Sequence, residues 1–144
     1  YELDITKLSD EEHSQVQRQV QLYKEYSDIV RNGDYYRIAS YSQNNQFDCW
    51  ASISKDKKQA LITFVQVLNH PNYKSIFVKI PGLAQDKKYK ATYVDEDQTQ
   101  NPPVILQGST LQNAGIKIAR PWGDFGSVLI YIEILNSEFR IQNS

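Results

Sequence analysis

The sequence predicts a mainly β protein: an antiparallel, Greek-key-type β-sandwich of about eight strands, preceded by one long amphipathic α-helix. Two patterns along the chain predict this fold. Apolar residues recur at the helical period up to residue 31, and after Gly33 they alternate with polar residues. Turn residues then recur about every ten positions, which is typical of sandwiches and barrels. The 144 residues suffice for one sizeable core and not for two full domains.

Composition excludes several classes of protein. The 16 Lys and Arg residues nearly balance the 17 Asp and Glu residues, so the chain lacks the basic footprint of a nucleic-acid-binding protein. Cys49 is the only cysteine, which excludes an internal disulfide and a cysteine-rich zinc site. No stretch is apolar enough to span a membrane, and no leader opens the sequence. We expect a cytoplasmic protein without metal or cofactor.

The first 32 residues are expected to form a short strand and the long helix. Residues 1–5 alternate apolar and acidic side chains, as a strand does. Ser9 and Glu12 have the spacing of a capping box, so a helix should follow over residues 9–31. Asn32-Gly33 has the composition of a left-handed helix end. Because the chain has no methionine and starts within an apparent strand, we expect it to be cut from a longer protein.

The helix carries a broad apolar stripe, with Gln, Arg and Lys on its other side. The stripe comprises Val16, Val20, Tyr23 and Val30, widened by Leu22, Tyr26 and Ile29.

From residue 33 on, period-2 alternation marks the strands of the sandwich domain, which we expect to span residues 33–144. The segment 60–68 is apolar on both faces, as in a central strand, and residues 55–58 form an exposed hairpin turn. The expected strands cover residues 36–40, 47–53, 60–68, 76–80, 89–94, 104–106, 115–118 and 128–134.

Several short motifs, in order along the chain, resemble the end of glycoside hydrolase family 36. They are Tyr1-Glu2-Leu3-Asp4, Gly33-Asp34-Tyr35-Tyr36-Arg37, Ile80-Pro81-Gly82-Leu83 with Lys88-Tyr89, Leu111-Gln112-Asn113-Ala114-Gly115-Ile116, and Trp122-Gly123-Asp124-Phe125-Gly126-Ser127. Gln112 departs from the Met that related sequences often carry, and the 95–103 loop is more polar than the family pattern. Both departures bear on packing. By this resemblance, residues 1–32 would be the last strand and helix of a catalytic barrel.

The resemblance implies an α-galactosidase that removes terminal α-galactose from sugars such as melibiose and raffinose with retention of configuration. This chemistry needs two carboxyl groups about 5 Å apart. In the family the nucleophile stands in a Lys-Trp-Asp segment, which this chain lacks. No catalytic residue is therefore assigned, and a non-catalytic C-terminal domain of such an enzyme is expected. Its partner would be the catalytic barrel, its contact with galactosides would run through that barrel, and the whole enzyme is expected to be a homo-oligomer.

Three acids have competing interpretations. Glu2 and Asp4 share one face of the expected strand and have the spacing of an acid/base pair, although surface or supporting roles explain them as well. Asp124, between glycines, either binds a ligand or caps a turn.

Aromatic side chains suggest a further candidate site. Trp50, Trp122, Tyr41 and Tyr73 could form a platform for a sugar ring, or they could pack in the core or between domains. Trp50 lies on the strand face opposite Phe47. His13 and His70 are isolated, so we expect both to be solvated, and Cys49 should be a buried small hydrophobic residue.

Two rival functions remain at this stage: a stand-alone galactoside-binding module, which would bind sugars saturably, and an oligomerisation module, which would self-associate.

Overall fold

A six-stranded antiparallel sheet is the centre of the fold in the computed structural model, which describes residues 4–71, 74–94, 99–119, 121 and 123–136. The strand order is β1-β2-β3-β8-β5-β6. The bounds are β1 (Asp34–Ala39), β2 (Phe47–Ile53), β3 (Gln59–Gln66), β5 (Lys88–Val94), β6 (Val104–Gln107) and β8 (Gly126–Ile134). The strand β8 pairs with β3 on one side and β5 on the other, so it joins the β1–β2–β3 meander and the β5–β6 hairpin into one sheet.

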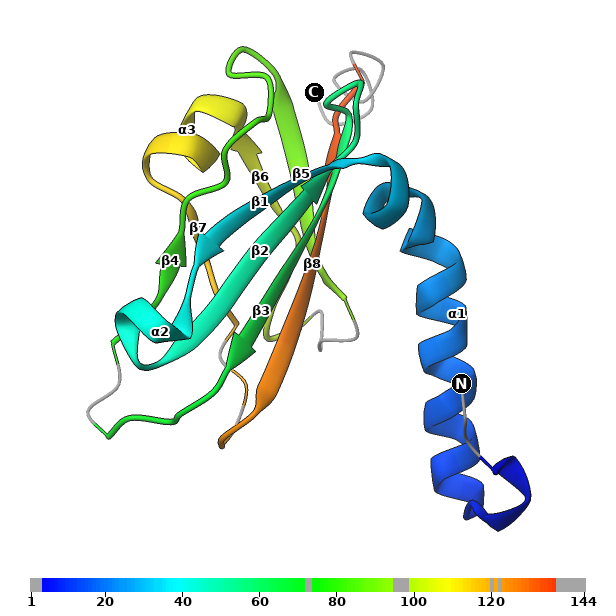
Figure 1. Cartoon of the computed structure of the whole chain (residues 1–144). Coiled ribbons are helices and arrows are strands. Elements are labelled where there is room, and N and C mark those ends of the chain that lie inside the picture. Colours follow the sequence, from blue (N-terminus) through cyan, green and yellow to red (C-terminus); the bar gives the residue numbers. More distant parts are fainter. Residues whose placement is uncertain (1–3, 72–73, 95–98, 120, 122, 137–144) are drawn as a thin grey trace.

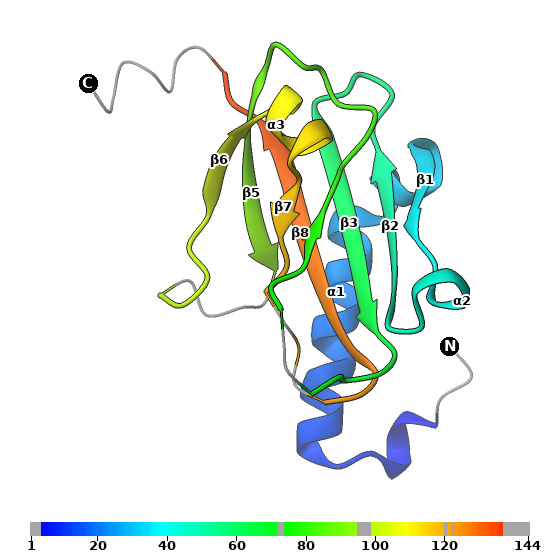
Figure 2. The same cartoon turned by 90° about the vertical axis from the view of Figure 1, so that its left-hand side faces the viewer.

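Two further layers cover this sheet. One face carries β4 (Phe77–Val78), β7 (Ile116–Lys117) and the short helix α3 (Gly108–Asn113), and Figure 2 shows them in front of the sheet. The long helix α1 (Asp10–Asn32) lies behind the opposite face. The expected sandwich of about eight strands with one long helix is therefore confirmed, although its second sheet is only two short strands.

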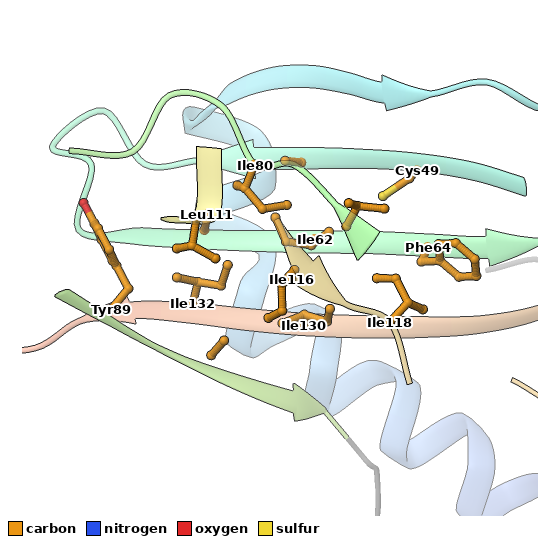
Figure 3. Close-up of a cluster of buried hydrophobic side chains, with 14 of the residues drawn as sticks. Cys49, Ile62, Phe64, Ile80, Tyr89, Leu111, Ile116, Ile118, Ile130 and Ile132 are labelled. Carbon is orange, nitrogen blue, oxygen red and sulfur yellow. The ribbon is translucent and has the colours of Figure 1, made fainter. Parts of the chain in front are cut away.

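The main core lies between the inner face of the sheet and the second layer (Figure 3). Alternate residues of β2, β3 and β8 point into it, as the period-2 pattern predicts. They are Cys49, Ala51, Ile53, Ala60, Ile62, Phe64, Val128, Ile130 and Ile132. The second layer adds Val78, Ile80, Leu111, Ile116 and Ile118. Each large aliphatic side chain buried here stabilises the fold by about 1.5–3 kcal/mol.

The phenol of Tyr89 shows how a polar group is accommodated in this core. Its ring is fully buried, and its hydroxyl donates to the Lys57 carbonyl at 2.9 Å and accepts from the Ala84 N–H at 3.0 Å. Because both hydrogen-bonding roles are filled, burial leaves no polar atom of Tyr89 unsatisfied.

Local sequence signals specify the beginning of α1. The Ser9 N–H donates to the Glu12 carboxylate at 2.8 Å, and the Glu12 N–H donates to the Ser9 hydroxyl at 3.3 Å. This reciprocal pair is the expected capping box. The helix follows one residue after its Ser9 cap and ends at Asn32, close to the expected 9–31.

The left-handed helix end expected at Gly33 is wrong. Gly33 has φ −80° and ψ 172°, an extended conformation open to any residue. Glycine stands there for a steric reason: a Cβ would lie 2.4 Å from the Ile29 carbonyl oxygen and 2.6 Å from that of Ile53. Close approach between the end of α1 and β2 therefore requires glycine, which no local pattern showed.

Other local predictions also differ from the structure. The strand expected over residues 1–5 does not reach Ile5, because Asp4 caps a 3-10 helix over Ile5–Lys7, and residues 1–3 lie outside the described part. The helices α2 (Tyr41–Asn44) and α3 were not expected. Both are too short for a periodic pattern. The strands expected at 76–80 and 115–118 are only two residues long. The Ile80 N–H donates to the Leu111 carbonyl of α3 instead of a strand partner, and the Lys117 carbonyl accepts from the Tyr93 hydroxyl.

Substitution of Gly33 tests the close approach. Gly33→Ala adds a Cβ that meets two backbone carbonyls, so we expect it to lower the free energy of unfolding by about 3 kcal/mol. Gly123→Ala is the matched control: its Cβ meets nothing within 4 Å, and its φ of +74° costs about 1 kcal/mol. Urea denaturation compares the two, and equal losses would contradict the steric explanation.

Candidate functional site

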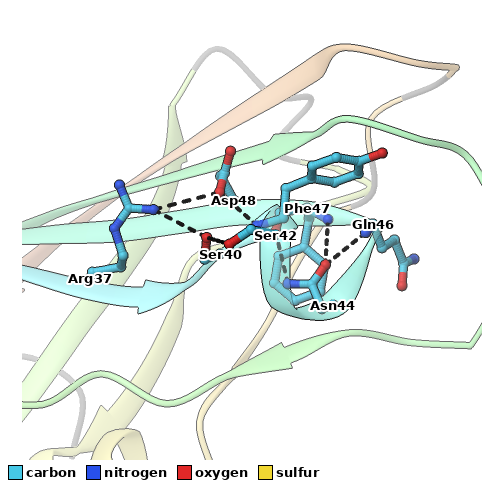
Figure 4. A network of polar contacts seen from close by, with 8 residues as sticks. Arg37, Ser40, Ser42, Asn44, Gln46, Phe47 and Asp48 are labelled. Carbon is cyan, nitrogen blue, oxygen red and sulfur yellow. Dashed lines mark hydrogen bonds and ion pairs between the residues drawn. The ribbon is translucent and has the colours of Figure 1, made fainter.

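A polar network surrounds α2, where β1 turns into β2 (Figure 4). Arg37 forms an ion pair with Asp48 at 3.8 Å and donates to the Ser40 hydroxyl at 3.4 Å. The other Asp48 contact is the Tyr41 N–H, which donates to the same carboxylate oxygen at 2.8 Å. Asp48 therefore caps the first turn of α2 and anchors Arg37.

The rest of the network also serves the turn (Figure 4). The Asn44 side-chain oxygen accepts from the N–H groups of Gln46 and Phe47 at 2.7 and 2.8 Å, and its amide donates to the Phe47 carbonyl. Asn45 follows in the left-handed conformation, with φ 57°. These polar groups are used in folding the β1–β2 connection, and Tyr41 is held there through its backbone.

Asp124 has a turn role in the structure. Its carboxylate accepts from the Asn69 N–H at 2.7 Å and so joins the loops that end β3 and precede β8. These loops and α2 lie at the same end of the sheet, because Phe47 pairs with Gln66 and Gln66 with Gly126. Tyr41 and Asp124 therefore share one end, but no hydrogen bond or ring contact joins them among the described residues. Trp122 and Tyr73 lie outside those residues.

Trp50 lies within β2, on the outer face of the sheet. Cross-strand pairing places it in one row with Arg37, Thr63, Leu129 and Val94. The indole is partly buried, and the row lies on the face that carries α1. Among the described candidates, no ring contact joins Trp50 to Tyr41, so the structure does not show a shared sugar platform for these two residues.

A small apolar cluster joins α1 to this outer face. Tyr26, Ile29 and Leu61 are buried in it, with Leu22 and Leu129 partly buried against them. The ring of Tyr26 lies 5.2 Å from the ring of Tyr131, within the range for aromatic pairing. Only the C-terminal half of α1 has buried residues, and Figure 1 shows the helix moving away from the sheet toward its N-terminus.

An apolar wedge opens beside this cluster. It has a volume of about 180 Å³ between α1 and the sheet. We use the name "α1 wedge" for its lining residues: Leu22, Tyr23, Tyr26, Ser27, Val30, Arg31, Leu61 and Leu129. Tyr23 and Val30 are 59% and 55% exposed. Sequence reasoning found the stripe to which they belong but could not tell which half the sheet would cover.

A second hollow, of about 400 Å³, lies between the edge strand β1 and β4. Ile38, Ala39 and Phe47 line one side, and Phe77, Val78 and Lys79 line the other. It is open to solvent and contains no acidic side chain among its lining residues, so it offers no carboxylate pair for glycoside hydrolysis.

Asp4 and Cys49, which the sequence singled out, lie in surroundings that favour structural roles. Asp4 accepts from the Thr6 N–H and hydroxyl, and these bonds lower the pKa of its exposed carboxyl. Glu2 lies outside the described residues. Cys49 is fully buried, and burial raises the pKa of its thiol to about 12, so the nucleophilic thiolate is disfavoured.

The histidines stand apart from one another. His13 is partly covered in the first half of α1, and the His70 ring contacts the Asn45 carbonyl at 3.2 Å. Within the described residues, no three His, Cys, Asp or Glu side chains group to bind a metal ion. No described helix is long and apolar enough to cross a membrane.

The fold and these sites define a β-sandwich domain with an apolar helix face, and comparison with known proteins places it in a family. The profile of the Glycosyl hydrolase family 36 C-terminal domain matches residues 47–132, more than half of the chain. The chain therefore belongs to the glycosyl hydrolase family 36 C-terminal domain family, as its motifs predicted.

Individual relatives agree with this assignment. The chain is 33% identical over 136 residues to the α-galactosidase Mel36A of Lactobacillus acidophilus, covering 94% of this chain and 17% of that protein. The crystal structure of the α-galactosidase from Lactobacillus brevis superposes with a TM-score of 0.83 at 30% identity, covering 95% of this chain and 18% of that one. A variant of AgaA from Geobacillus stearothermophilus, in complex with raffinose, gives a TM-score of 0.80 at 26% identity, covering 92% and 17%. The chain thus spans about one-sixth of these relatives.

The buried phenol of Tyr26 makes the packing of α1 sensitive to high pH. Burial, with the Glu25 carboxylate acting in the same direction, raises the pKa of Tyr26 from 10.0 to about 12. The folded chain therefore holds this proton more tightly than the unfolded chain. Its stabilising effect is complete below about pH 10 and is lost as the pH rises towards 12.

Urea denaturation between pH 9 and 12 measures this decline. Burial also raises the pKa values of Tyr89, Tyr93 and Tyr131, so several groups contribute. Tyr26→Phe keeps the ring contact and removes the phenol, so it should flatten the decline. An undiminished slope in Tyr26→Phe would contradict the prediction.

Proposed function

We propose that this chain is the non-catalytic C-terminal part of a retaining α-galactosidase, and that it braces the catalytic part of the same polypeptide through α1. Family membership supports the first half of this proposal, and the uncovered half of the α1 apolar surface supports the second. Relatives about six times longer are α-galactosidases, and one was solved in complex with raffinose. Raffinose-type α-galactosides are therefore the proposed substrates of the whole enzyme.

The observation that carries the bracing role is the two-sided surface of α1. Successive residues of an α-helix are about 100° apart around its axis, so Leu22, Tyr26 and Ile29 lie within an arc of about 60°. This arc packs on the sheet. Val16, Val20, Tyr23 and Val30 occupy the adjacent arc of about 80°. No described element covers Tyr23 or Val30.

A helix that is apolar over half its circumference needs a partner on each side. The sheet supplies one partner for α1. The α1 wedge faces the other, and its lining is predominantly apolar. We propose that the preceding barrel, of which residues 1–32 would be the last strand and helix, fills this wedge.

The described acids support a catalytic pair elsewhere in the polypeptide. Asp4, Asp48, Asp56 and Asp124 each accept hydrogen bonds that stabilise caps or turns. Retaining hydrolysis instead requires two carboxyl groups about 5 Å apart facing one sugar. A cytoplasmic location and a homo-oligomeric parent stay predictions of the sequence.

A galactoside-binding module is the second candidate, and partly exposed Trp50 on the outer face is the observation that favours it. An aromatic ring presents a flat apolar surface on which the C–H face of a sugar can stack. Among the described residues no ring contact joins Trp50 to Tyr41, and Asp124 already accepts from the Asn69 N–H, which argues against one composite platform.

The first experiment assays hydrolysis of an aryl α-galactoside by the 144-residue chain alone, beside calorimetric titration with raffinose. We expect neither turnover nor heat of binding. Turnover would overturn the non-catalytic role and direct attention to Glu2 and Asp4. Saturable heat without turnover would favour the galactoside-binding module.

Replacement of the uncovered apolar side chains tests the bracing role. Without its partner, the chain should self-associate through the α1 wedge. Tyr23→Ser combined with Val30→Ser should weaken this association about tenfold or more, because each side chain buried in a contact contributes about 1.5 kcal/mol or more. Light scattering across a concentration series measures the effect.

The matched control replaces two polar residues of the same helix, Gln17→Ser with Lys24→Ser, and should leave association unchanged. A wild-type chain that stays monomeric at millimolar concentration would count against an uncovered docking face.

A further inference from the structure

We propose that the turn Gly123–Gly126 holds Phe125 in a fixed position, and that Phe125 anchors the catalytic part of the same polypeptide to this domain. This inference rests on the proposed function and adds a second contact, remote from the α1 wedge. Phe125 is 75% exposed, more than any other large apolar side chain of the described residues. Its backbone has φ 60°, a left-handed conformation that is unusual for an aromatic residue.

A buried amide holds the turn from below. Gln66 is 0% exposed at the end of the central strand β3, and its Nε2 donates to the Gly123 carbonyl at 2.7 Å and to the Pro121 carbonyl at 3.4 Å. Burial of such an amide is costly unless it is hydrogen-bonded. The turn is therefore attached to the core of the sheet and does not move as a free loop.

A second set of hydrogen bonds fixes the residues on either side of Phe125. The Asp124 carboxylate accepts from the Asn69 N–H at 2.7 Å, and Gly126 pairs with Gln66 in the β3–β8 ladder. Phe125 is thus held between two bound neighbours in a strained conformation with its ring in solvent. Strained backbone that the surrounding structure maintains is characteristic of functional contacts. Leu68, 39% exposed, precedes Asn69 and adds a second apolar side chain near this end of the sheet.

The shape of this site favours a protein surface over a sugar. A sugar site needs a concave setting with polar groups directed at hydroxyls. Neither of the two hollows described above is lined by Phe125, and the Asp124 carboxylate already binds Asn69. A projecting aromatic side chain suits insertion into a pocket of a partner protein.

The area of the site indicates which protein partner it fits. An aromatic side chain buries about 150–250 Å², and Leu68 adds less. A stable complex between separate proteins buries about 800 Å² on each partner. Phe125 and Leu68 fall well short of this area, so they could not hold a second copy by themselves. A tethered partner at high effective concentration needs far less area. The remaining five-sixths of the polypeptide, inferred from the 17% coverage of Mel36A, is such a partner.

The test uses the full-length enzyme and the substitution Phe125→Asn. Asparagine adopts φ 60° readily, so within the turn this change relieves strain and favours stability. Loss of an interdomain anchor instead lowers the stability of the whole enzyme. We expect Phe125→Asn to shorten the half-life of activity at a fixed elevated temperature several-fold and to accelerate limited proteolysis between the domains. Phe125→Tyr keeps an aromatic ring at this position, so its half-life and its rate of proteolysis should stay within about twofold of the wild-type values.

Phe77→Asn is the control, because it removes another exposed aromatic side chain from a different surface; it should change neither readout by more than about twofold. An unchanged or longer half-life for Phe125→Asn would overturn the anchor. A change in oligomer size on light scattering would identify a second copy as the partner and overturn the tethered assignment. If the Tyr23→Ser, Val30→Ser enzyme is destabilised while Phe125→Asn is not, only this inference fails. If neither of these two variant enzymes is destabilised, both this inference and the bracing proposal fail.

Discussion

The pairing of β8 between β3 and β5 is the constraint on which the rest of the structure depends. β3 and β8 share eight residue pairs, and β8 and β5 share six. Without β8, the β1–β2–β3 meander and the β5–β6 hairpin would be two small sheets with open edges, and isolated hairpins are marginal in water. Insertion of the last strand therefore creates the continuous inner face against which the second layer packs.

This sheet also organises both candidate interaction surfaces. Its inner residues make the main core, while its outer residues Leu61, Leu129 and Tyr131 receive α1. The end of the β3–β8 ladder carries Gln66 and Gly126, which hold the turn of Phe125. One rigid element thus supports a helix face and a turn that the proposals assign to the same partner, as expected for a domain that braces a larger enzyme.

Polar groups near the ends of the sheet hold turns and helix ends in place through hydrogen bonds. Asp48 caps α2 and pairs with Arg37, Asp124 joins two loops, and the Tyr89 hydroxyl ties the Lys57 hairpin to Ala84. The candidate sugar contacts could be named from residue type, but their arrangement could not, because Trp50 lies within β2, Tyr41 begins α2 and Asp124 lies in the loop before β8, and only tertiary structure places these elements. The family was predictable because its turn motifs, unlike a binding platform, are local.

The sequence by itself determined the elements whose causes are local. These are the Ser9–Glu12 capping box of α1, the alternation of Val128, Ile130 and Ile132, and the turn at residues 55–58. Tertiary structure alone decided which half of the α1 stripe is buried, that Gly33 is needed for contact with Ile53, and that the Gln66 amide lies in the core beneath the Phe125 turn. The physical reason is that periodicity and capping depend on neighbours within one turn or strand, whereas close approach and burial depend on residues far apart in the chain.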